Sequence, residues 1–161
     1  MMAIIRPATA ADVTAVLPMV QAVCDFHRAL EPARYDFLPD IAARYALWLP
    51  RRAADPHSVF LVAEQSEAPV GFIVGEVLDE IPIYTVKRYG FIHDLWVEPA
   101  ARGRGIGRAL VQRALDRFAA MGVSQVRGDT AWTNQAARRL VGTLGFAPST
   151  VTVVAKLAQN P

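Results

Sequence analysis

A glycine-rich turn between an apolar run and an amphipathic segment constrains the fold of this chain more than any other feature. The β-rich run at 90–97 ends at Glu98-Pro99, and residues 102–107 (Arg-Gly-Arg-Gly-Ile-Gly) follow. Beyond them, apolar positions 110, 111, 114, 115, 118 and 121 fall on one helical face. A strand, a glycine turn and a helix in this order direct several backbone N–H groups, and the positive end of the helix dipole, at one point. The pattern predicts an anion site whose natural ligand is a phosphate.

The type of phosphate site is restricted by what the turn lacks. A P-loop requires Gly-Lys-Ser/Thr, and there is no lysine here. A dinucleotide-binding fold requires G-x-G-x-x-G, whereas the chain has G-x-G-x-G; only Asp129, about 20 residues further on, fits that alternative. One strand–helix–strand unit is also too little for such a fold. A tight turn without a ligand stays open as the other interpretation.

The hydrophobic pattern of the whole chain predicts an α/β (mixed α+β) fold in a single domain, residues 1–161. The sheet is expected to be mostly antiparallel before residue 90 and to gain one parallel strand after it. Strands are expected at 3–6, 59–63, 70–74, 90–97, 123–130 and 150–157, and helices at 9–24, before Pro50, at 106–121 and at 134–143. Thr9 and Asp12 form a capping box, Pro18 should shorten or kink the first helix, and Gly122 and Gly145 are suited to left-handed helix ends.

Composition excludes several classes of protein. The single cysteine, Cys24, rules out a disulfide scaffold and a cysteine zinc site, and its helical spacing from Val20 predicts a buried thiol. No metal site is expected. No apolar run approaches the roughly 18 residues of a membrane span, and the start of the chain lacks a signal-peptide pattern, so a cytoplasmic protein with no membrane partner is expected.

The charge of the chain is unevenly distributed. The net charge of +2 combines 8 basic and 13 acidic residues before position 102 (−5) with 9 basic and 2 acidic residues after it (+7). An arginine-rich half of this kind suits phosphates or nucleic acid, or is an ordinary solvated surface. Nucleic acid is disfavoured, because the basic residues are not interleaved with aromatic ones.

The motifs together resemble a known family. The glycine turn matches the R/Q-x-x-G-x-G/A acetyl-CoA loop of the GCN5-related N-acetyltransferases (GNAT), with Leu-Trp-Val-Glu-Pro at 95–99 leading into it. Asn134-x-x-Ala137 and Leu-Gly-Phe at 144–146 resemble the closing motif, and residues 5–9 resemble the opening strand and turn. The segment 92–97 also resembles the branch that contains diamine acetyltransferases. The resemblance implies a GNAT-like domain: a mostly antiparallel central sheet with a splayed parallel pair, flanked by helices.

The resemblance also implies an acetyl-CoA site, with acetyl-CoA as acetyl donor. The backbone of strand 91–97 would pair with the pantetheine amides, the glycine loop would hold the pyrophosphate, and the last helix would begin near the sulfur. An amine would attack the thioester directly, so Cys24 is not required. The implied cofactor-binding residues are Leu95, Trp96, Val97, Arg102, Gly103, Arg104, Gly105, Ile106, Gly107, Arg108 and Asn134.

Two catalytic candidates lie on the strand before the loop. His93 and Asp94 are suited to take a proton from the amine, and strand alternation is expected to send them to opposite faces, so that only one lines the site; the resemblance favours His93. A backbone N–H near Val97 would polarise the carbonyl. Many family members use a tyrosine as acid where this chain has Val141, so water or another group, such as Tyr84 or Tyr89, must protonate the thiolate.

These observations predict an acetyl-CoA-dependent N-acetyltransferase that modifies a primary amine of a small molecule. The alternatives are a protein or peptide amine acetyltransferase and a catalytically weak CoA-binding module. The acceptor region is expected to be rich in carboxylates suited to a cationic amine, and a homodimer is expected from the resemblance. The polar residues of that region are His27, Glu31, Tyr35, Asp36, Asp40, Asp79 and Glu80.

Overall fold

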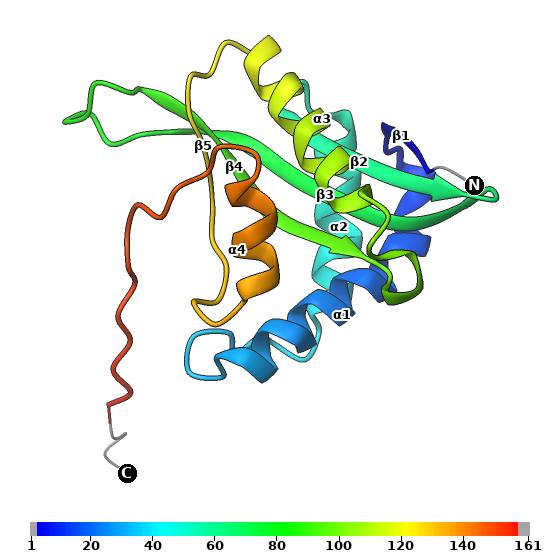
Figure 1. Cartoon of the computed structure of the whole chain (residues 1–161), viewed down its shortest axis with the longest axis horizontal. Helices are drawn as coiled ribbons and strands as arrows, with labels where there is room; N and C mark the ends of the chain where they lie inside the picture. The colour runs from blue at the N-terminus through cyan, green and yellow to red at the C-terminus, as the bar shows by residue number, and fades with distance from the viewer. Residues whose placement is uncertain (1–2, 158–161) are drawn as a thin grey trace.

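The computed structural model describes residues 3–157 and shows a five-stranded sheet with helices on both faces (Figure 1). The strands lie in the order β1-β2-β3-β4-β5; the first four pair antiparallel, and β5 pairs parallel to β4. The strands are β1 (Ile4–Pro7), β2 (Ser58–Gln65), β3 (Ala68–Asp79), β4 (Arg88–Val97) and β5 (Val126–Gly128). The helices are α1 (Val13–Leu30), α2 (Ile41–Ala54), α3 (Ile106–Ala120) and α4 (Gln135–Gly142), with short 3₁₀ turns η1 (Ala10–Asp12) and η2 (Pro99–Ala101).

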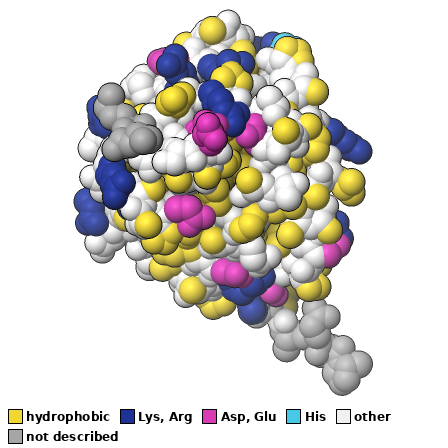
Figure 2. Space-filling model, turned by 90° about the vertical axis from the view of Figure 1, so that its right-hand side faces the viewer, with side chains coloured by type: hydrophobic (Ala, Val, Ile, Leu, Met, Phe, Trp, Pro, Cys, Tyr) yellow, Lys and Arg dark blue, Asp and Glu magenta, His cyan; other side chains and the backbone are white. Residues whose placement is uncertain are grey.

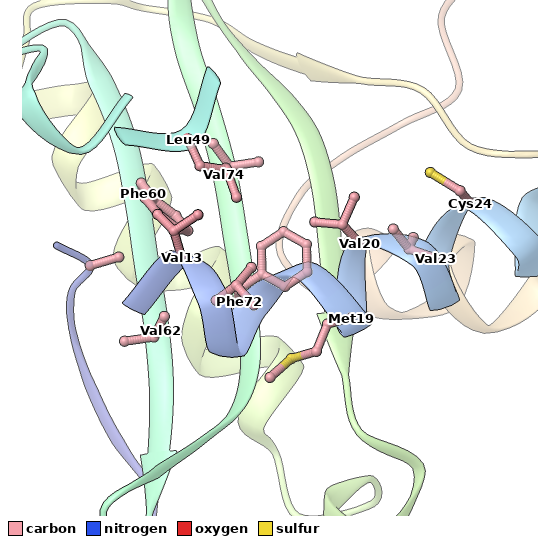
Figure 3. Close-up of a cluster of buried hydrophobic side chains, with 12 residues drawn as sticks. Val13, Met19, Val20, Val23, Cys24, Leu49, Phe60, Val62, Phe72 and Val74 are labelled. Atoms are coloured by element: carbon pink, nitrogen blue, oxygen red, sulfur yellow. The ribbon is translucent and has the colours of Figure 1, made fainter. Parts of the chain in front are cut away.

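Alternation along the central strands builds a separate core on each face of the sheet. In β2, Phe60 and Val62 pack with α1 and α2, whereas Val59 and Leu61 pack with α3. Figure 3 shows the first of these cores, in which the side chains of α1 meet those of β2 and β3. Both layers are needed, because β2 and β3 are buried on both sides. The expected mixed α/β fold is confirmed.

The expected effect of two prolines on the helix ends is wrong. Pro18 and Pro50 lie inside α1 and α2, which run on to Leu30 and Ala54. Burial of the apolar face of each helix offsets the hydrogen bond that a proline removes. By contrast, Gly122 and Gly145 have φ of 79° and 89°, and so adopt the expected left-handed conformation.

The strand expected at 150–157 is not formed, and the one expected at 123–130 is reduced to β5. Residues 150–157 are exposed and pair with no described strand, and Figure 1 shows this segment leading away from the body of the protein. Their alternating pattern predicts the extended conformation, but a strand also requires a neighbour. β5 pairs with β4 over three residues, because the two strands then diverge.

Charged groups of both signs are mixed on the surface. The face turned to the viewer in Figure 2 carries acidic side chains next to arginines and lysines, with exposed hydrophobic groups between them. The uneven distribution of charge along the sequence therefore does not produce a continuous basic surface on this face. None of the helices within residues 3–157 has the length and apolar character that a membrane crossing requires.

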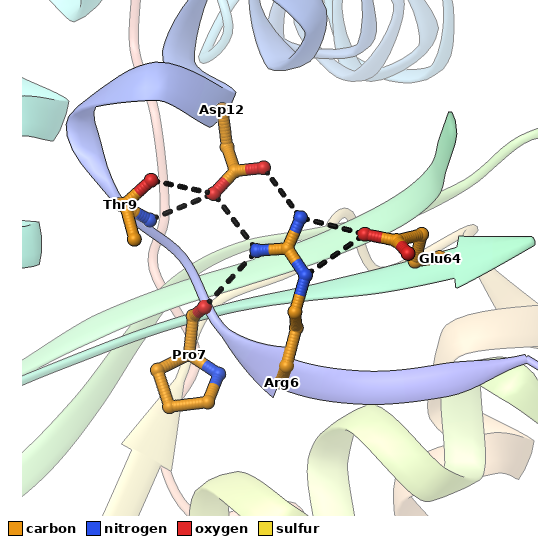
Figure 4. Close-up of polar contacts among 5 residues, drawn as sticks. All are labelled: Arg6, Pro7, Thr9, Asp12 and Glu64. Atoms are coloured by element: carbon orange, nitrogen blue, oxygen red, sulfur yellow. Dashed lines mark hydrogen bonds and ion pairs between the residues drawn. The ribbon is translucent and has the colours of Figure 1, made fainter. Parts of the chain in front are cut away.

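A partly buried ion-pair cluster fixes the start of α1 to the sheet (Figure 4). The Arg6 guanidinium donates to both carboxylate oxygens of Asp12 at 2.7 and 2.9 Å, and to Glu64 of β2 at 2.8 Å. Asp12 also accepts from the backbone N–H of Thr9 at 2.8 Å and from its hydroxyl at 3.1 Å, so the expected reach of Asp12 back to Thr9 is confirmed. The Arg6 hydrogen bonds, with those from Thr9, lower the pKa of Asp12 to about 2.

Acid is expected to remove the stability that Asp12 contributes. Its pKa is about 2 in the folded protein against 3.8 ordinarily, so folding favours the charged form above about pH 4, and the contribution disappears as the pH falls toward 2. The shift corresponds to about 2 kcal/mol of unfolding free energy. Asp12→Asn should therefore be clearly less stable than the parent at neutral pH, and the difference should shrink across that window. Denaturant unfolding at about pH 7, 4 and 2 measures this, with the exposed Asp116→Asn as control; a difference independent of pH would contradict the assignment.

Candidate active site

The sheet opens where β4 separates from β5. Their parallel pairing covers Gly90 to Ile92 on β4 and Val126 to Gly128 on β5, and no further. Residues 94–97 stay paired to β3 on their other side. This splayed pair, which the resemblance implied, leaves the second edge of 93–97 without a described partner strand. An extended ligand can take that edge, because it still carries backbone donors and acceptors.

A cavity of about 470 Å³ lies next to this opening. Its wall includes every expected cofactor-binding residue except Arg104. It also includes three side chains of α1, of which His27 had been grouped with the acceptor region, and three small or apolar residues of α4. The lining residues are Val23, Phe26, His27, Leu95, Trp96, Val97, Arg102, Gly103, Gly105, Ile106, Gly107, Arg108, Asn134, Ala136, Ala137 and Leu140.

The three glycines of the loop serve two different purposes. Gly103 and Gly105 have φ of 73° and 78°, a left-handed conformation that side chains other than glycine rarely adopt. Gly107 has an ordinary backbone but lies against α4, since a Cβ there would come within 3.3 Å of a Leu140 methyl. Gly105 immediately precedes α3, so the unpaired first N–H groups of that helix face the loop. The geometry suits an anion at the start of α3.

The three arginines of the loop have unequal roles. Arg102 donates from Nε to the carbonyl of Val97 at 2.8 Å and lies 4.5 Å from the centre of the Trp96 ring. Arg108 donates to the hydroxyl of Thr143 at 2.6 Å and thereby connects α3 to the end of α4. Arg104 is exposed. Two of the arginines expected around a phosphate, Arg102 and Arg108, therefore also stabilise the conformation of the loop. The Val97 carbonyl already accepts a hydrogen bond from Arg102.

A β-bulge at His93 overturns the expectation that His93 and Asp94 face opposite ways. Asp94 is opposite Val74 and Ile92 is opposite Gly75, so His93 is an extra residue in β4. The extra residue cancels the alternation: the His93 ring lies 5.2 Å from that of Trp48, and Asp94 accepts a 2.7 Å hydrogen bond from Tyr45. Both partners belong to α2, so both candidates face the same helix.

His93 is paired with a carboxylate. Its Nε2 lies 2.9 Å from Glu76, which also forms an ion pair with Arg52. The His93 side chain is 28% exposed, and its ring packs edge-on against those of Trp48 and Phe91. Neither His93 nor Asp94 belongs to the cavity wall; they directly precede Leu95 and Trp96, which do.

Burial controls the ionisation of the neighbouring groups. It raises the pKa of Asp94, an effect that the Tyr45 hydrogen bond and the positive charge of His93 and His27 oppose. Burial also raises the pKa of Cys24 to about 12, so its thiol stays protonated and the expected buried thiol is confirmed. The raised pKa makes Asp94 a stronger base than an ordinary carboxylate.

Asn134 has a structural role at the start of α4, whereas the residues considered as proton donors to the thiolate lie outside the cavity wall. Asn134 caps α4: its side-chain oxygen accepts from the Ala137 N–H at 3.1 Å, and its amide donates to the Thr130 hydroxyl at 2.9 Å. Neither Tyr84, Tyr89 nor Val141 lines the cavity. Among residues 3–157, no group of three or more His, Cys, Asp or Glu side chains is arranged to hold a metal ion.

The sheet that opens beside a glycine loop defines the class of protein, an acetyltransferase-like α/β domain. The chain belongs to the Acetyltransferase (GNAT) family, whose model matches residues 20–146. A protein of Bacillus halodurans, BH1408, has the same fold, with a TM-score of 0.81, 23% identity, and coverage of 96% of this chain and 99% of that one. A predicted acetyltransferase from Clostridium acetobutylicum, solved with acetyl-CoA, gives a TM-score of 0.74 at 19% identity, with 96% of both chains covered.

Relatives by sequence act on different acceptors. A mycothiol acetyltransferase of Beutenbergia cavernae is 36% identical over 60% of this chain and 31% of its own length. An L-2,4-diaminobutyric acid acetyltransferase of Nocardia farcinica is 40% identical over 50% of this chain and 37% of its own length. The chain therefore spans about a third of these two relatives. An uncharacterised N-acetyltransferase of Bacillus subtilis, YhfO, is 27% identical over 91% of both chains.

Proposed function

We propose that this protein is an acetyl-CoA-dependent N-acetyltransferase that transfers the acetyl group directly to a primary amine of a small molecule. The cavity between the open edge of β4, the glycine loop and α4 is the observation that carries the proposal. The GNAT family membership supports it, as does the structural neighbour solved with acetyl-CoA. We also propose that residues 1–161 act as one acetyltransferase domain.

The cavity offers a separate binding element to each part of the donor. The N–H groups around Gly103–Gly107 suit the pyrophosphate, and the exposed Arg104 adds a guanidinium at the same end. The open edge of 93–97 suits the amides of pantetheine, which would add to the sheet as a short strand. The apolar side chains of Val23, Phe26 and Leu140 exclude water from the remainder.

The chemistry needs a neutral amine and a polarised carbonyl. The Nε2–H of His93 can donate to Glu76, which leaves Nδ1 free to take a proton from the acceptor ammonium. The amine nitrogen then bonds to the thioester carbon. The oxygen on that carbon accepts a hydrogen bond from a backbone N–H near Val97. The carbon–sulfur bond breaks and the electron pair stays on sulfur, while the nitrogen, which now carries one hydrogen too many for an amide, releases a second proton to water. Asp94 is the alternative base, because it lies on the same side of β4.

The acceptor is proposed to be small and cationic. Glu76 lies next to His93, and its carboxylate, which Arg52 shares, is the acid that would favour a positively charged amine there. Several acids of the expected acceptor region are already engaged: Asp40 with Arg44, and Glu80 with Arg127. The similarity to a diaminobutyric acid acetyltransferase agrees with a diamine-like acceptor. A peptide amine is the competing acceptor, because an N-alpha-acetyltransferase of Mycobacterium tuberculosis is 36% identical over 60% of this chain.

Two measurements test the proposed function. Calorimetric titration should show acetyl-CoA binding in the micromolar range, and a panel of small diamines, amino acids and peptides should release free thiol in the presence of acetyl-CoA. Turnover with peptides alone would favour the competing acceptor, and binding without any turnover would favour a CoA-binding module. Absence of acetyl-CoA binding would overturn the proposal.

We also propose a cytoplasmic homodimer. The single cysteine is a buried free thiol, which suits a reducing compartment. Val151, Val153 and Leu157 are 75–89% exposed and alternate with other residues, as strand residues do. Pairing of this segment with a second copy would cover them. Sedimentation should then give a dimer, and replacement of both valines by lysine should give a monomer; a monomeric parent would contradict the assembly.

A further inference from the structure

The donor cavity contains a titratable group that no step above uses. His27, near the end of α1, lines the cavity. Each of its two ring nitrogens has a polar partner. Nδ1 lies 3.0 Å from the carbonyl oxygen of Val23, one helical turn earlier. A carbonyl oxygen only accepts, so Nδ1 carries a hydrogen. In the neutral ring the other nitrogen, Nε2, is therefore without one.

Nε2 points to a hydroxyl that connects the two walls of the cavity. It lies 3.4 Å from Oγ1 of Thr130, in the segment between β5 and α4. The same oxygen accepts a 2.9 Å hydrogen bond from the Asn134 amide, and Asn134 lines the cavity opposite α1. The chain His27–Thr130–Asn134 thus joins α1 to the start of α4, which Figure 1 places next to each other.

The direction of the Thr130 hydrogen depends on the charge of His27. A hydroxyl has one hydrogen and two acceptor positions, and Asn134 takes one of those positions. When His27 is neutral, the hydroxyl hydrogen points to the bare Nε2. When His27 is an imidazolium, Nε2–H fills the second acceptor position, and the hydroxyl hydrogen is free to turn away from His27. Thr130 itself is not on the cavity wall, but both of its partners, His27 and Asn134, are.

We propose that His27, acting through the Thr130 hydroxyl, supplies the proton that the departing CoA thiolate takes up. As the carbon–sulfur bond breaks, sulfur forms a bond to the Thr130 hydroxyl hydrogen, and Thr130 Oγ1 takes the Nε2 hydrogen of His27. His27 becomes neutral and regains a proton from solvent. This inference depends on the proposed function and accounts for a reaction that proceeds with Val141 where a tyrosine acid is usual.

Other charged and titratable groups surround His27 and enter its pH dependence. Asp94 from β4 is close enough for the His27 charge to act on it. The Tyr35 ring lies 4.8 Å from that of His27. Two titratable residues flank His27 in sequence: Cys24 comes three residues before it, and Glu31 comes four residues after it. The Glu31 carboxylate accepts a hydrogen bond from the Trp132 N–H. From α4, Arg138 is engaged with the Trp132 ring.

The test combines kinetics with a readout that is independent of turnover. In the parent, kcat should fall at high pH with the loss of one proton, in addition to any loss at low pH from the amine base. His27→Gln and Thr130→Val should abolish the high-pH fall and lower kcat by about 10- to 100-fold. Thr130→Ser keeps the hydroxyl and should restore both features. Imidazole ¹⁵N shifts should show the Nδ1–H form of neutral His27, with a titration midpoint equal to the kinetic one.

Each outcome bears on a definite claim. A high-pH fall that persists in His27→Gln, an Nε2–H tautomer, or parental kcat in Thr130→Val would overturn the inference while acetyl-CoA binding and turnover leave the proposed function intact. A parent chain that binds no acetyl-CoA overturns the proposed function, and this inference with it. Unfolding midpoints of the variants, compared with Thr130→Ser, show whether a loss of kcat reflects loss of the fold.

Discussion

Gly105→Asp is expected to weaken acetyl-CoA binding by about 100-fold or more. The loop at Gly105 opens on the donor cavity, and a carboxylate there would meet the phosphates in the place where backbone N–H groups should bind them. Like charges in contact at an interface cost several kcal/mol, and about 1.4 kcal/mol is a tenfold change in affinity. Calorimetric titration with acetyl-CoA measures the effect.

Gly122→Asp is a closely matched control for this variant. Gly122 has φ of 79° against 78° for Gly105, and at both positions a Cβ would meet nothing within 4 Å. The two substitutions therefore impose a similar backbone strain, about 1–2 kcal/mol. Gly122 follows α3 at its other end and is not part of the cavity wall. Both variants should lose similar stability and only Gly105→Asp should lose binding; equal loss in both would place the phosphate site elsewhere.

His93→Ala is expected to lower kcat/KM for acetyl transfer by about 100-fold or more, the usual contribution of a positioned general base. Because its Nε2 faces Glu76, the proton from the amine goes to Nδ1, and the variant has no group at that position. The low-pH loss of kcat/KM should disappear with the ring. Acetyl-CoA affinity should change little, because His93 does not line the donor cavity. Steady-state kinetics from about pH 5 to 9 measure both effects.

Two further variants make this result specific. His57→Ala removes an exposed imidazole that is also outside the donor cavity, and it should leave the kinetics unchanged. Asp94→Asn removes the alternative base without a change of size. If the low-pH loss disappears in Asp94→Asn and persists in His93→Ala, the base is Asp94, and the pairing of His93 with Glu76 only orients the acceptor.

Local sequence signals predicted the parts of the site that depend on neighbouring residues. The glycine loop adopts left-handed φ at Gly103 and Gly105, as its composition indicates, and it opens α3 where the helical pattern begins. The reach of Asp12 back to Thr9 follows from a spacing of three residues. These features need only a few consecutive residues, so the sequence contains all the information for them.

Tertiary contacts decided the orientation of the candidate catalytic groups. Alternation along β4 predicts opposite faces for His93 and Asp94, and the bulge that reverses this exists only through pairing with β3. Likewise, the pairing of His93 with Glu76 joins β4 to β3 across 17 residues of sequence. Neither result has a local signal, because each depends on which partner the fold brings opposite.

The sequence by itself determined the family of this protein, its mixed sheet and the residues of the glycine loop, because each of these rests on periodicity, turn chemistry or a contiguous motif. The tertiary structure decided how far β5 follows β4, which way β4 presents its histidine, and that His27 reaches Thr130, 103 residues away. These features depend on contacts between distant segments, which the packing of α1 and α4 around the opened sheet creates.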